Sequence, residues 1–398
     1  MNAVVLGAGR SGQAASALLR REGWNVTILN GSDPWDGSGC DLCVTSPGIS
    51  IDHPWQAAAR AVGVPVISEL QLGAERYRSL GGRMLAVTGS KGKSSVVKLV
   101  SDALGGVPCG NYGTPLCEVV NDWVQNRSTG GYVPPWAVVE VSSFQMETTE
   151  LPSDAFVAAA ILNLQEDHLD RHGSVETYHS LKRRLLDFAE RRIQWRDGAE
   201  RKSDAELFAG GYFDNGILRD NAICAVRLMR AAGLSDDAIR SAFARFEPLP
   251  HRMQGIGTFG GVVWIDDSKA TSIAALAAGV EMAASRIRPS TTKAVHLIAG
   301  GLPKGDDPNV AAECLSRYVR KAYLIGKSAE SLQSSWSGIV QCEVCETLER
   351  AVKSAMRSAE SGECVLLSPG AASFDQFRSY GERGDRFKAL VSELSQSR

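Results

Sequence analysis

The stretch Thr88-Gly-Ser-Lys-Gly-Lys-Ser-Ser95 comes directly after an apolar run, Arg83–Thr88, and before a segment with helical periodicity. A strand that passes through a glycine-rich turn into a helix presents backbone N–H groups and the helix N-terminus to an anion. In such a loop Lys93 can neutralise the β- and γ-phosphates of ATP, and the Ser94 hydroxyl can hold Mg²⁺. We therefore predict an ATP-binding loop made of Gly89, Ser90, Lys91, Gly92, Lys93, Ser94 and Ser95, although Val87 stands where the common P-loop motif has glycine.

Around this loop, short apolar runs alternate with amphipathic stretches, the pattern of parallel α/β sheets. Glycine and proline breaks at Gly81-Gly82 and Glu247–Pro250 divide the chain into three predicted α/β domains, 1–80, 81–248 and 249–398. Helices are expected at Ser11–Glu22 and Tyr178–Lys202. Besides Arg83–Thr88, we predict strands at Ala3–Leu6, Trp24–Leu29, Asp41–Val44, Val64–Ile67, Ala137–Val141, Phe156–Leu164, Val262–Ile265, Ala294–Ala299, Ala322–Ile325, Ile339–Val344 and Cys364–Leu367.

The bulk composition excludes some classes of protein. The 398-residue chain has a formal net charge of −2, whereas dedicated nucleic-acid binders carry a strong basic excess. Its N-terminus lacks the pattern of a signal peptide, and no run reaches the roughly 18 apolar residues of a membrane span. We expect a cytoplasmic monomer without nucleic-acid or membrane partners. The nine cysteines are expected to be free, mostly buried thiols, with zinc or redox use of Cys40/Cys43 and Cys342/Cys345 as the alternative.

A second glycine motif, Gly7-Ala-Gly-Arg-Ser-Gly12, follows the first predicted strand. The spacing G-x-G-x-x-G after a strand is typical of dinucleotide-binding proteins, which place an acidic residue at the end of the second strand to bind the ribose. Asn30 occupies that position here. The turn is therefore interpreted as one that holds another diphosphate, or that only packs the helix on the strand.

Acidic residues, histidine and lysine gather where other strands end. His168 and its acidic neighbours lie in Asn163–His172, and Glu140 closes a strand. Because ligands bind at the carboxyl ends of strands in open α/β sheets, these residues are candidates for a metal or phosphate site. In Asp266–Thr271, Lys269 would present a charge at a strand end and Asp267 could reach a ribose, unless the segment is only a helix cap.

Taken in order, these motifs resemble those of the Mur ligase family of peptidoglycan synthesis. The family's phosphate loop has the shorter form T-G-x-x-G-K-[S/T], which accounts for Val87. The segment Ser368–Phe377, together with Gly381–Gly384 after it, indicates the glutamate-adding branch of the family. The Asp-Asn-Pro-Arg motif of the diaminopimelate-adding relatives is not found. The resemblance covers most of the chain and runs through Gly7–Gly12, Ser46-Pro47-Gly48, Glu140–Gln145, Asp167-His168, His251-Arg252, Asp267–Thr271, Gly300–Gly305 and Ser368–Phe377.

The resemblance implies a fold and an activity. The fold would combine an N-terminal Rossmann-like parallel sheet, a central P-loop NTPase-like mononucleotide-binding domain and a C-terminal Rossmann-like domain. These would bind the UDP-muramoyl substrate, ATP and the amino acid. The activity would be that of an ATP- and Mg²⁺-dependent ligase that joins D-glutamate to UDP-N-acetylmuramoyl-L-alanine through an acyl phosphate.

The resemblance also assigns residues to roles, by matched position. The catalytic residues would be Lys93, Glu140, His168, Lys182 and Lys269. The metal ligands would be Ser94, Glu140, His168 and, if it is carbamylated, Lys182. Besides the phosphate loop, the nucleotide would contact Asn221, Arg252, Asp267, Lys269 and Thr271. The UDP-muramoyl substrate would contact Gly9, Arg10, Ser11, Ser46, Gly48, Asn111 and Ser142, and the glutamate carboxylates would contact Lys304, Ser373 and Tyr380.

Departures from the family pattern leave alternatives open. The stretch from Lys182 to Asn221 is shorter than usual, Gln254 follows Met253 where glutamate is common, Asn30 replaces an acid near the uracil, and Tyr380 replaces a common phenylalanine. The alternatives are the same ligase chemistry with L-glutamate or another amino acid, a dehydrogenase that uses the Gly7–Gly12 turn, and a non-catalytic P-loop protein.

Overall fold

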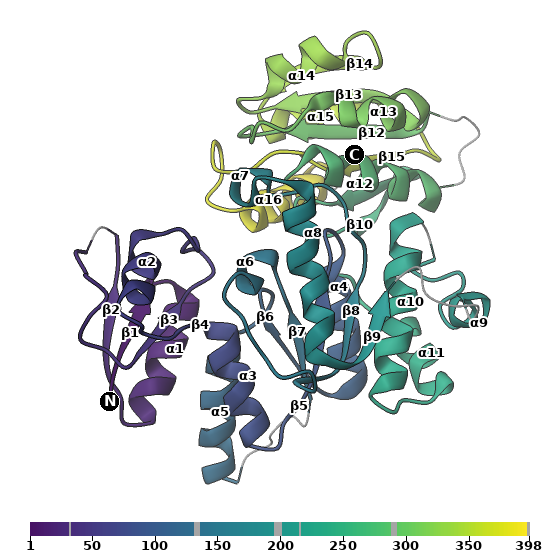
Figure 1. The fold of residues 1–398 in the computed structure, drawn as a ribbon. Helices are drawn as coiled ribbons and strands as arrows, with labels where there is room; N and C mark the ends of the chain where they lie inside the picture. The colour runs from purple at the N-terminus through teal and green to yellow at the C-terminus, as the bar shows by residue number, and fades with distance from the viewer. Residues whose placement is uncertain (32, 131–135, 195–200, 215, 288–292, 396–398) are drawn as a thin grey trace. The chain divides into compact units, whose positions relative to one another are not determined.

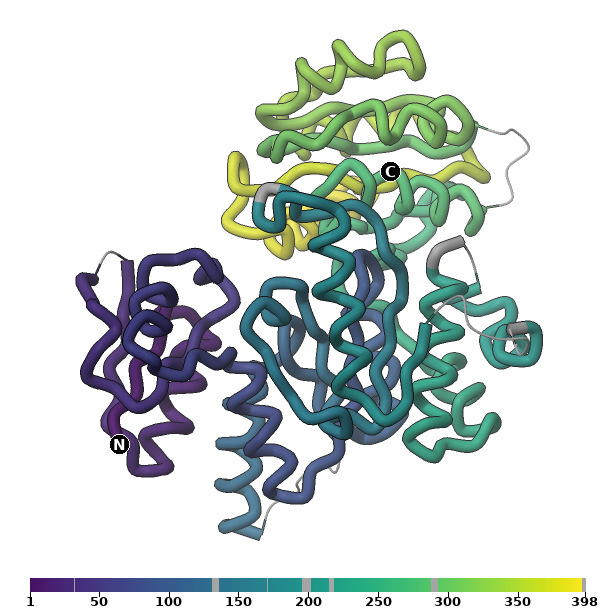
Figure 2. Tube along the Cα trace, viewed as in Figure 1, coloured from purple at the N-terminus to yellow at the C-terminus, as the bar shows by residue number. Residues whose placement is uncertain are grey.

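The computed structural model describes residues 1–31, 33–130, 136–194, 201–214, 216–287 and 293–395. Contacts within the chain define two compact units, one of Met1–Asp214 with Leu218–Phe246 and one of Asn215–Ile217 with Glu247–Arg398. The first unit contains two β-sheets and the second contains one (Figure 1). Figure 2 follows the chain through them, from purple through teal to yellow. Since helices cover these largely parallel sheets, the predicted α/β class is confirmed.

The first sheet is parallel, with strand order β2-β1-β3-β4. Val5, Leu6, Cys43 and Val44 are fully buried, as expected of strands covered on both faces. Each of the four strands lies within two residues of its predicted position. The elements are β1 (Asn2–Leu6), α1 (Arg10–Arg21), β2 (Asn25–Leu29), β3 (Leu42–Thr45), α2 (Pro54–Ala61), β4 (Val66–Ser68) and α3 (Glu69–Ser79).

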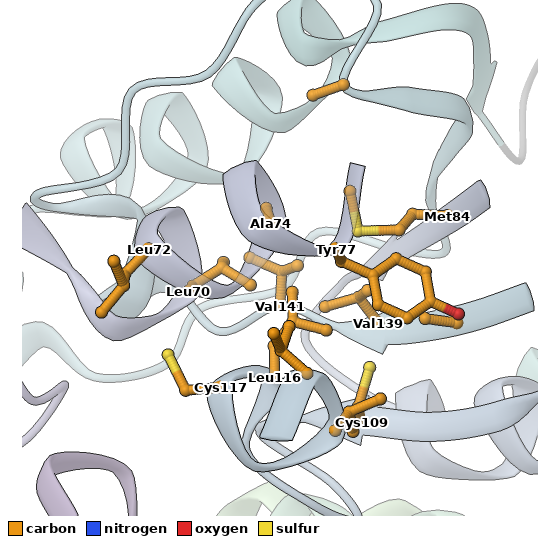
Figure 3. Packing of buried hydrophobic residues seen from close by; sticks show 14 of the residues in the cluster. Leu70, Leu72, Ala74, Tyr77, Met84, Cys109, Leu116, Cys117, Val139 and Val141 are labelled. Carbon is orange, nitrogen blue, oxygen red and sulfur yellow. The ribbon is translucent and has the colours of Figure 1, made fainter. Parts of the chain in front are cut away.

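The second sheet is also parallel, in the order β6-β7-β5-β8-β9, so that the strand before the phosphate loop lies at its centre. Figure 3 shows Leu70 and Tyr77 of α3 packed with Leu116 of α5 and Val139 of β7 in one buried cluster. The elements are β5 (Arg83–Thr88), α4 (Lys93–Leu104), β6 (Val107–Gly110), α5 (Leu116–Ser128), β7 (Trp136–Glu140), α6 (Ser143–Met146), β8 (Phe156–Ile161), α7 (Leu169–His172), α8 (Val175–Arg184), η1 (Leu185–Phe188), β9 (Ala189–Gln194), α9 (Arg201–Glu206), α10 (Gly216–Ala231) and α11 (Asp236–Ala244).

The helix predicted over Tyr178–Lys202 is wrong. Helix α8 ends at Arg184, and the chain then forms β9, which pairs in parallel with β8 at the edge of the sheet. Ala189 and Ile193 are buried four residues apart, a spacing that suits a helix, while the residues between them are exposed. Pairing with β8 overrides that local pattern, as tertiary context does for short segments. Residues 195–200 of the predicted helix lie outside the described residues.

The third sheet has the order β10-β11-β15-β12-β13-β14 and is parallel except for β10. Its predicted strands are confirmed. Strand β10 and, in the second sheet, the edge strand β6 were missed, because glycine interrupts the apolar pattern of β10 and proline and glycine interrupt that of β6. The elements are β10 (Gln254–Phe259), β11 (Val262–Asp266), α12 (Ile273–Arg286), β12 (Val295–Gly300), η2 (Pro308–Ala311), α13 (Ala312–Tyr318), β13 (Val319–Ile325), α14 (Ala329–Trp336), β14 (Gln341–Glu346), α15 (Leu348–Ser358), β15 (Cys364–Leu367) and α16 (Tyr380–Ser395).

The nine cysteines are free thiols, and seven of them are buried, which confirms their predicted state. Among the helices of the described residues, none is long and apolar enough to cross a membrane.

Candidate active site

The phosphate loop joins β5 to α4 at the centre of the second sheet. Gly92 is the N-cap of α4 with φ +83°, a left-handed conformation that favours glycine. A Cβ atom at Gly92 would lie 2.0 Å from Asn221 Nδ2. Glycine therefore keeps the backbone of this turn compact, and the first amides of α4 remain at the loop, where a helix N-terminus binds anions.

Two lysines converge on one carbonyl of this loop. Lys93 Nζ donates hydrogen bonds to the carbonyl oxygens of Gly89 (2.8 Å) and Ser90 (3.3 Å). Lys182 Nζ, from α8, donates to the same Gly89 oxygen (3.0 Å). The Lys182 residue is only 1% exposed, and burial, followed by the charge of Lys93, lowers its pKa from 10.5 to about 7. Two amines, of which that of Lys182 is buried and has a lowered pKa, therefore meet at the Gly89 carbonyl.

Asn163, which follows β8, is hydrogen-bonded to the phosphate loop, a role that was not predicted from the sequence. Its Oδ1 accepts from the Lys91 amide (2.9 Å), and its Nδ2 donates to the Lys91 carbonyl (2.8 Å) and to Asn221 Oδ1 (2.9 Å). Its own carbonyl accepts from the Ser90 amide (3.1 Å). Asn221, fully buried, contacts both Asn163 and the Lys91 carbonyl and so supports the loop. The sequence signal for Asn163 is weak: it is a polar residue inside the predicted strand Phe156–Leu164 and comes two residues after the end of β8.

Glu140 ends β7, as predicted, and is nearly fully buried. Its Oε1 accepts from Asn111 Nδ2 (2.7 Å), and its backbone carbonyl accepts from the Asn111 amide (2.9 Å). Within the described ranges, Oε2 is buried without a hydrogen-bond partner. Since a buried carboxylate oxygen normally has a partner, this atom fits a cation that the protein would bind in use.

The described residues contain no ready-made cluster of three or more His, Cys, Asp or Glu side chains for a metal. Mg²⁺ needs none, because it is usually held by one or two carboxylates, several waters and the phosphates of a nucleotide. Glu140 and the Ser94 hydroxyl at the start of α4 are oxygen donors of that kind.

The Asp167-His168 segment begins α7. His168 has φ +54° and a side chain that is about half exposed. Lys91 Nζ lies 3.3 Å from Asp167 Oδ2. Although burial raises the pKa of Asp167, the charges of Lys91 and His168 lower it on balance. This carboxylate therefore stays ionised and ties a phosphate-loop side chain to the segment with His168.

The predicted UDP-substrate residues lie at loops of the first two sheets. Ser46 Oγ donates to the Gly7 carbonyl (3.3 Å), and Arg10 donates to the Gly113 carbonyl (2.9 Å) and lies 3.4 Å from Glu118. A Cβ atom at Gly12 would lie 1.9 Å from the Gly7 oxygen, so the glycine motif allows α1 to pack closely on β1. Gly9 is the N-cap of α1, Ser11 lies in its first turn, and Ser142 caps α6 through the Gln145 amide.

In the second unit, predicted residues follow β11, β12 and β15. Lys269 Nζ lies 4.2 Å from the centroid of the Tyr380 ring, and Lys304 Nζ donates to Thr271 Oγ1 (3.2 Å). Ser373 is buried, whereas Tyr380 is 37% exposed. Lys269 with Tyr380 and Lys304 with Thr271 are thus brought into two close pairs.

Asp267 is buried, and both of its carboxylate oxygens accept hydrogen bonds within its own unit. Its Oδ1 accepts from the Met253 amide (3.1 Å) and its Oδ2 from Ser368 Oγ (3.0 Å). Burial raises its pKa to about 7. The segment is not a helix cap, since α12 is capped by Ser272.

Arg383 is a second residue that the sequence analysis missed. It is 1% exposed and donates to the Ser268 oxygens and to the carbonyls of Ala371 and Ala372. Burial lowers the pKa of its guanidinium to about 10. Because these carbonyls flank Lys269 and Ser373, Arg383 holds both predicted substrate loops.

Comparisons with known proteins agree with this arrangement. Residues 87–203 match the family model of the Mur ligase middle domain, and residues 251–370 match that of the Mur ligase, glutamate ligase domain. The UDP-N-acetylmuramoylalanine–D-glutamate ligase of Acidobacterium capsulatum is 34% identical over 98% of this chain and 95% of its own length. The equally named protein of Koribacter versatilis is 32% identical over 99% and 97%.

Solved structures share the fold. MurF ligase from Thermotoga maritima in complex with ADP aligns with a TM-score of 0.59 at 15% identity, over 90% of each chain. The UDP-N-acetylmuramate–alanine ligase MurC of the same organism aligns with a TM-score of 0.57 at 16% identity, over 100% of each. With relatives above 30% identity along nearly its whole length, and with the phosphate loop and Glu140 in place, the chain belongs to the Mur ligase family.

Proposed function

We propose that this protein is the ATP-dependent ligase that joins D-glutamate to UDP-N-acetylmuramoyl-L-alanine in peptidoglycan precursor synthesis. The observation that carries the proposal is the near full-length similarity to relatives that bear this enzyme's name. The site supports it, because a phosphate loop, a buried amine and an unpartnered carboxylate oxygen lie together in the first unit.

The reaction has two steps. A carboxylate oxygen of the UDP-linked L-alanine attacks the γ-phosphorus of ATP, and ADP leaves, which gives an acyl phosphate. The amine of D-glutamate then attacks the acyl carbon, a tetrahedral intermediate forms, and phosphate leaves as the amine proton is lost. Little covalent chemistry falls to the protein, so its residues position the reactants and neutralise phosphate charge.

The loop residues have defined parts in this scheme. Lys93 would turn from the Gly89 and Ser90 carbonyls to the phosphates of ATP. Glu140 Oε2 and the Ser94 hydroxyl would hold a first Mg²⁺, and His168 would serve a second. The metal, when bound, supplies positive charge at the transferring phosphoryl group. Asn221 Nδ2 donates to the Lys91 carbonyl (3.4 Å), so we propose that Asn221 acts on ATP through the Lys91 backbone.

Lys182 is suited to carbamylation. With a pKa of about 7, roughly half of the amine is neutral at pH 7. Its nitrogen can attack CO₂, form an N–C bond and release a proton to solvent. The product is an anion beside the phosphate loop, which could serve as a ligand for a second Mg²⁺.

The remaining assignments follow the matched positions. Gly9, Arg10, Ser11, Ser46, Gly48, Asn111 and Ser142 would hold the UDP-muramoyl substrate. Lys304, Ser373 and Tyr380 would bind the glutamate carboxylates, and Arg252, Asp267, Lys269 and Thr271 would contact the nucleotide or its transferred phosphate. The three domains 1–80, 81–248 and 249–398 would bind the UDP substrate, ATP and glutamate in a cytoplasmic monomer.

The test is incubation with UDP-N-acetylmuramoyl-L-alanine, ATP and Mg²⁺ together with either D- or L-glutamate, followed by mass spectrometry of the UDP product. Amide product with D-glutamate only is the expected result. Product with L-glutamate only would favour the alternative stereochemistry. No product with either, together with binding of NADH, would favour a dehydrogenase, and ATP binding without product would favour a non-catalytic P-loop protein.

A further inference from the structure

Arg171, on the short helix α7, contacts a loop more than a hundred residues away in the sequence. Its Nη2 donates to the carbonyls of Pro47 (3.3 Å) and Ile49 (3.2 Å), and its Nη1 donates to the carbonyl of Gly48 (3.5 Å). Three consecutive carbonyls thus face one guanidinium. They belong to the loop after β3, which contains the predicted substrate residues Ser46 and Gly48.

The guanidinium is itself fixed in place. Arg171 Nε donates to Glu147 Oε1 (2.9 Å) and Nη2 to Oε2 (2.7 Å), the bidentate geometry that gives an arginine–carboxylate pair its directionality. The side chains are 15% and 6% exposed. The Arg171 guanidinium carbon also lies 4.7 Å from the centroid of the Phe144 ring. The guanidinium is therefore held by Glu147 through Nε and Nη2, while Nη1 and Nη2 also donate to the loop.

Arg171 and Glu147 belong to the segments that contain the proposed metal residues. Glu147 immediately follows α6, the first helix after Glu140 on β7, and Arg171 lies three residues after His168. His172 strengthens the junction, since its Nε2 lies 3.0 Å from Ser143 Oγ and its Nδ1 lies 3.4 Å from Glu147 Oε1. One ion pair thus joins the loop after β3 to the segments that follow β7 and β8.

We infer that Arg171 is a positioning residue, which fixes the Pro47–Ile49 loop so that the UDP-linked substrate presents its carboxylate to the phosphate loop. The inference rests on the proposed function. A lysine would keep the charge at position 171 but lack the planar guanidinium, whose several N–H groups donate to Glu147 and to the carbonyls at the same time. Loss of the Arg171 guanidinium should therefore weaken binding of the UDP substrate more than binding of ATP.

The test compares full-length wild type with Arg171→Lys and Arg171→Ala in steady-state ligation. The KM for UDP-N-acetylmuramoyl-L-alanine should rise about ten- to a hundredfold in both variants, since loss of hydrogen bonds from a charged group weakens binding by a factor of about that order. The KM for ATP should stay within about twofold. A role limited to stability would not separate the two constants.

Arg21→Ala is the matched control. Arg21 also links the first two sheets, through a 2.8 Å hydrogen bond from α1 to the Asn121 carbonyl on α5, but it is exposed and outside the proposed site. Its kinetic constants should match wild type. ADP titration by calorimetry verifies that each variant is folded, and Glu147→Gln supplies a second variant that weakens the same ion pair and should show the same separation at a smaller amplitude.

The outcomes separate the two claims. Absence of product from wild type refutes the proposed function and the inference that rests on it. Ligation by wild type, with an unchanged KM for the UDP substrate in Arg171→Ala, overturns the inference alone. An equal rise of both KM values in the Arg171 variants, or the same rise in Arg21→Ala, would also overturn it.

Discussion

Replacement of Lys182 by methionine should stabilise the protein, and by an amount that depends on pH. The difference between the ordinary pKa of 10.5 and the folded value of about 7 corresponds to about 5 kcal/mol of unfavourable free energy at pH 6. The variant loses the hydrogen bond to Gly89, worth about 1 kcal/mol, but that carbonyl keeps Lys93 as a donor. The expected gain at pH 6 is therefore about 4 kcal/mol.

The sign of the pH dependence follows from proton binding. Between pH 7 and 10.5 the unfolded chain binds a proton at Lys182 that the folded protein does not, so the unfolding free energy of wild type rises with pH in this window. Methionine has no such slope. The advantage of Lys182→Met should fall to about 1 kcal/mol at pH 9.

Urea unfolding followed by circular dichroism, at pH 6, 7, 8 and 9 in CO₂-free buffer, measures this difference. Exclusion of CO₂ keeps the amine unmodified. Lys98→Met removes a partly exposed lysine of α4 that pairs with Asp102 and controls for the loss of a cation. If the stability of Lys182→Met relative to wild type did not change between pH 6 and 9, the amine would not be desolvated, and its proposed readiness for carbamylation would be wrong.

Three further predictions concern residues with defined contacts. Asn163→Ala removes both hydrogen bonds to Lys91 and leaves buried Asn221 Oδ1 without this donor. It should lower the unfolding free energy by about 1–3 kcal/mol and weaken ADP binding measured by calorimetry. Unchanged ADP affinity would contradict the role of Asn163 in the loop. Glu140→Gln should raise the Mg²⁺ concentration for half-maximal ligation by about ten- to a hundredfold, and an unaltered Mg²⁺ titration would remove Glu140 from the metal site. Arg383→Met leaves buried carbonyls without their donor and should cost about 3 kcal/mol or more in urea unfolding, so a loss below 1 kcal/mol would show that the arginine is dispensable.

The parts of the fold that could be predicted are those where burial and local pattern agree. The strands at Arg83–Thr88 and Cys364–Leu367 are apolar runs buried in their sheets, and the observed bounds match the predicted ones. The turn that follows Thr88 was readable because glycine is needed there for its backbone conformation. Strand β9 was not readable, since its buried residues suit a helix equally well and only pairing with β8 decides.

The site was predictable to a lesser extent, for a different reason. Glu140 and Lys93 belong to short motifs with fixed spacing, so their places at the end of β7 and the start of α4 follow from the sequence. Asn163, Arg171 and Arg383 act through hydrogen bonds to backbone carbonyls that are distant in sequence in all three cases. Every residue has a backbone carbonyl, so the residue types in the sequence do not indicate which carbonyl accepts such a hydrogen bond.

The central claim is that the protein forms an amide between UDP-N-acetylmuramoyl-L-alanine and D-glutamate at the expense of ATP. The most direct measurement is the mass of the UDP product, together with the ratio of product to ADP, after incubation with each glutamate enantiomer. We expect one ADP for each amide formed, and product with D-glutamate only. ADP release without amide, or product that forms equally without ATP, would contradict it.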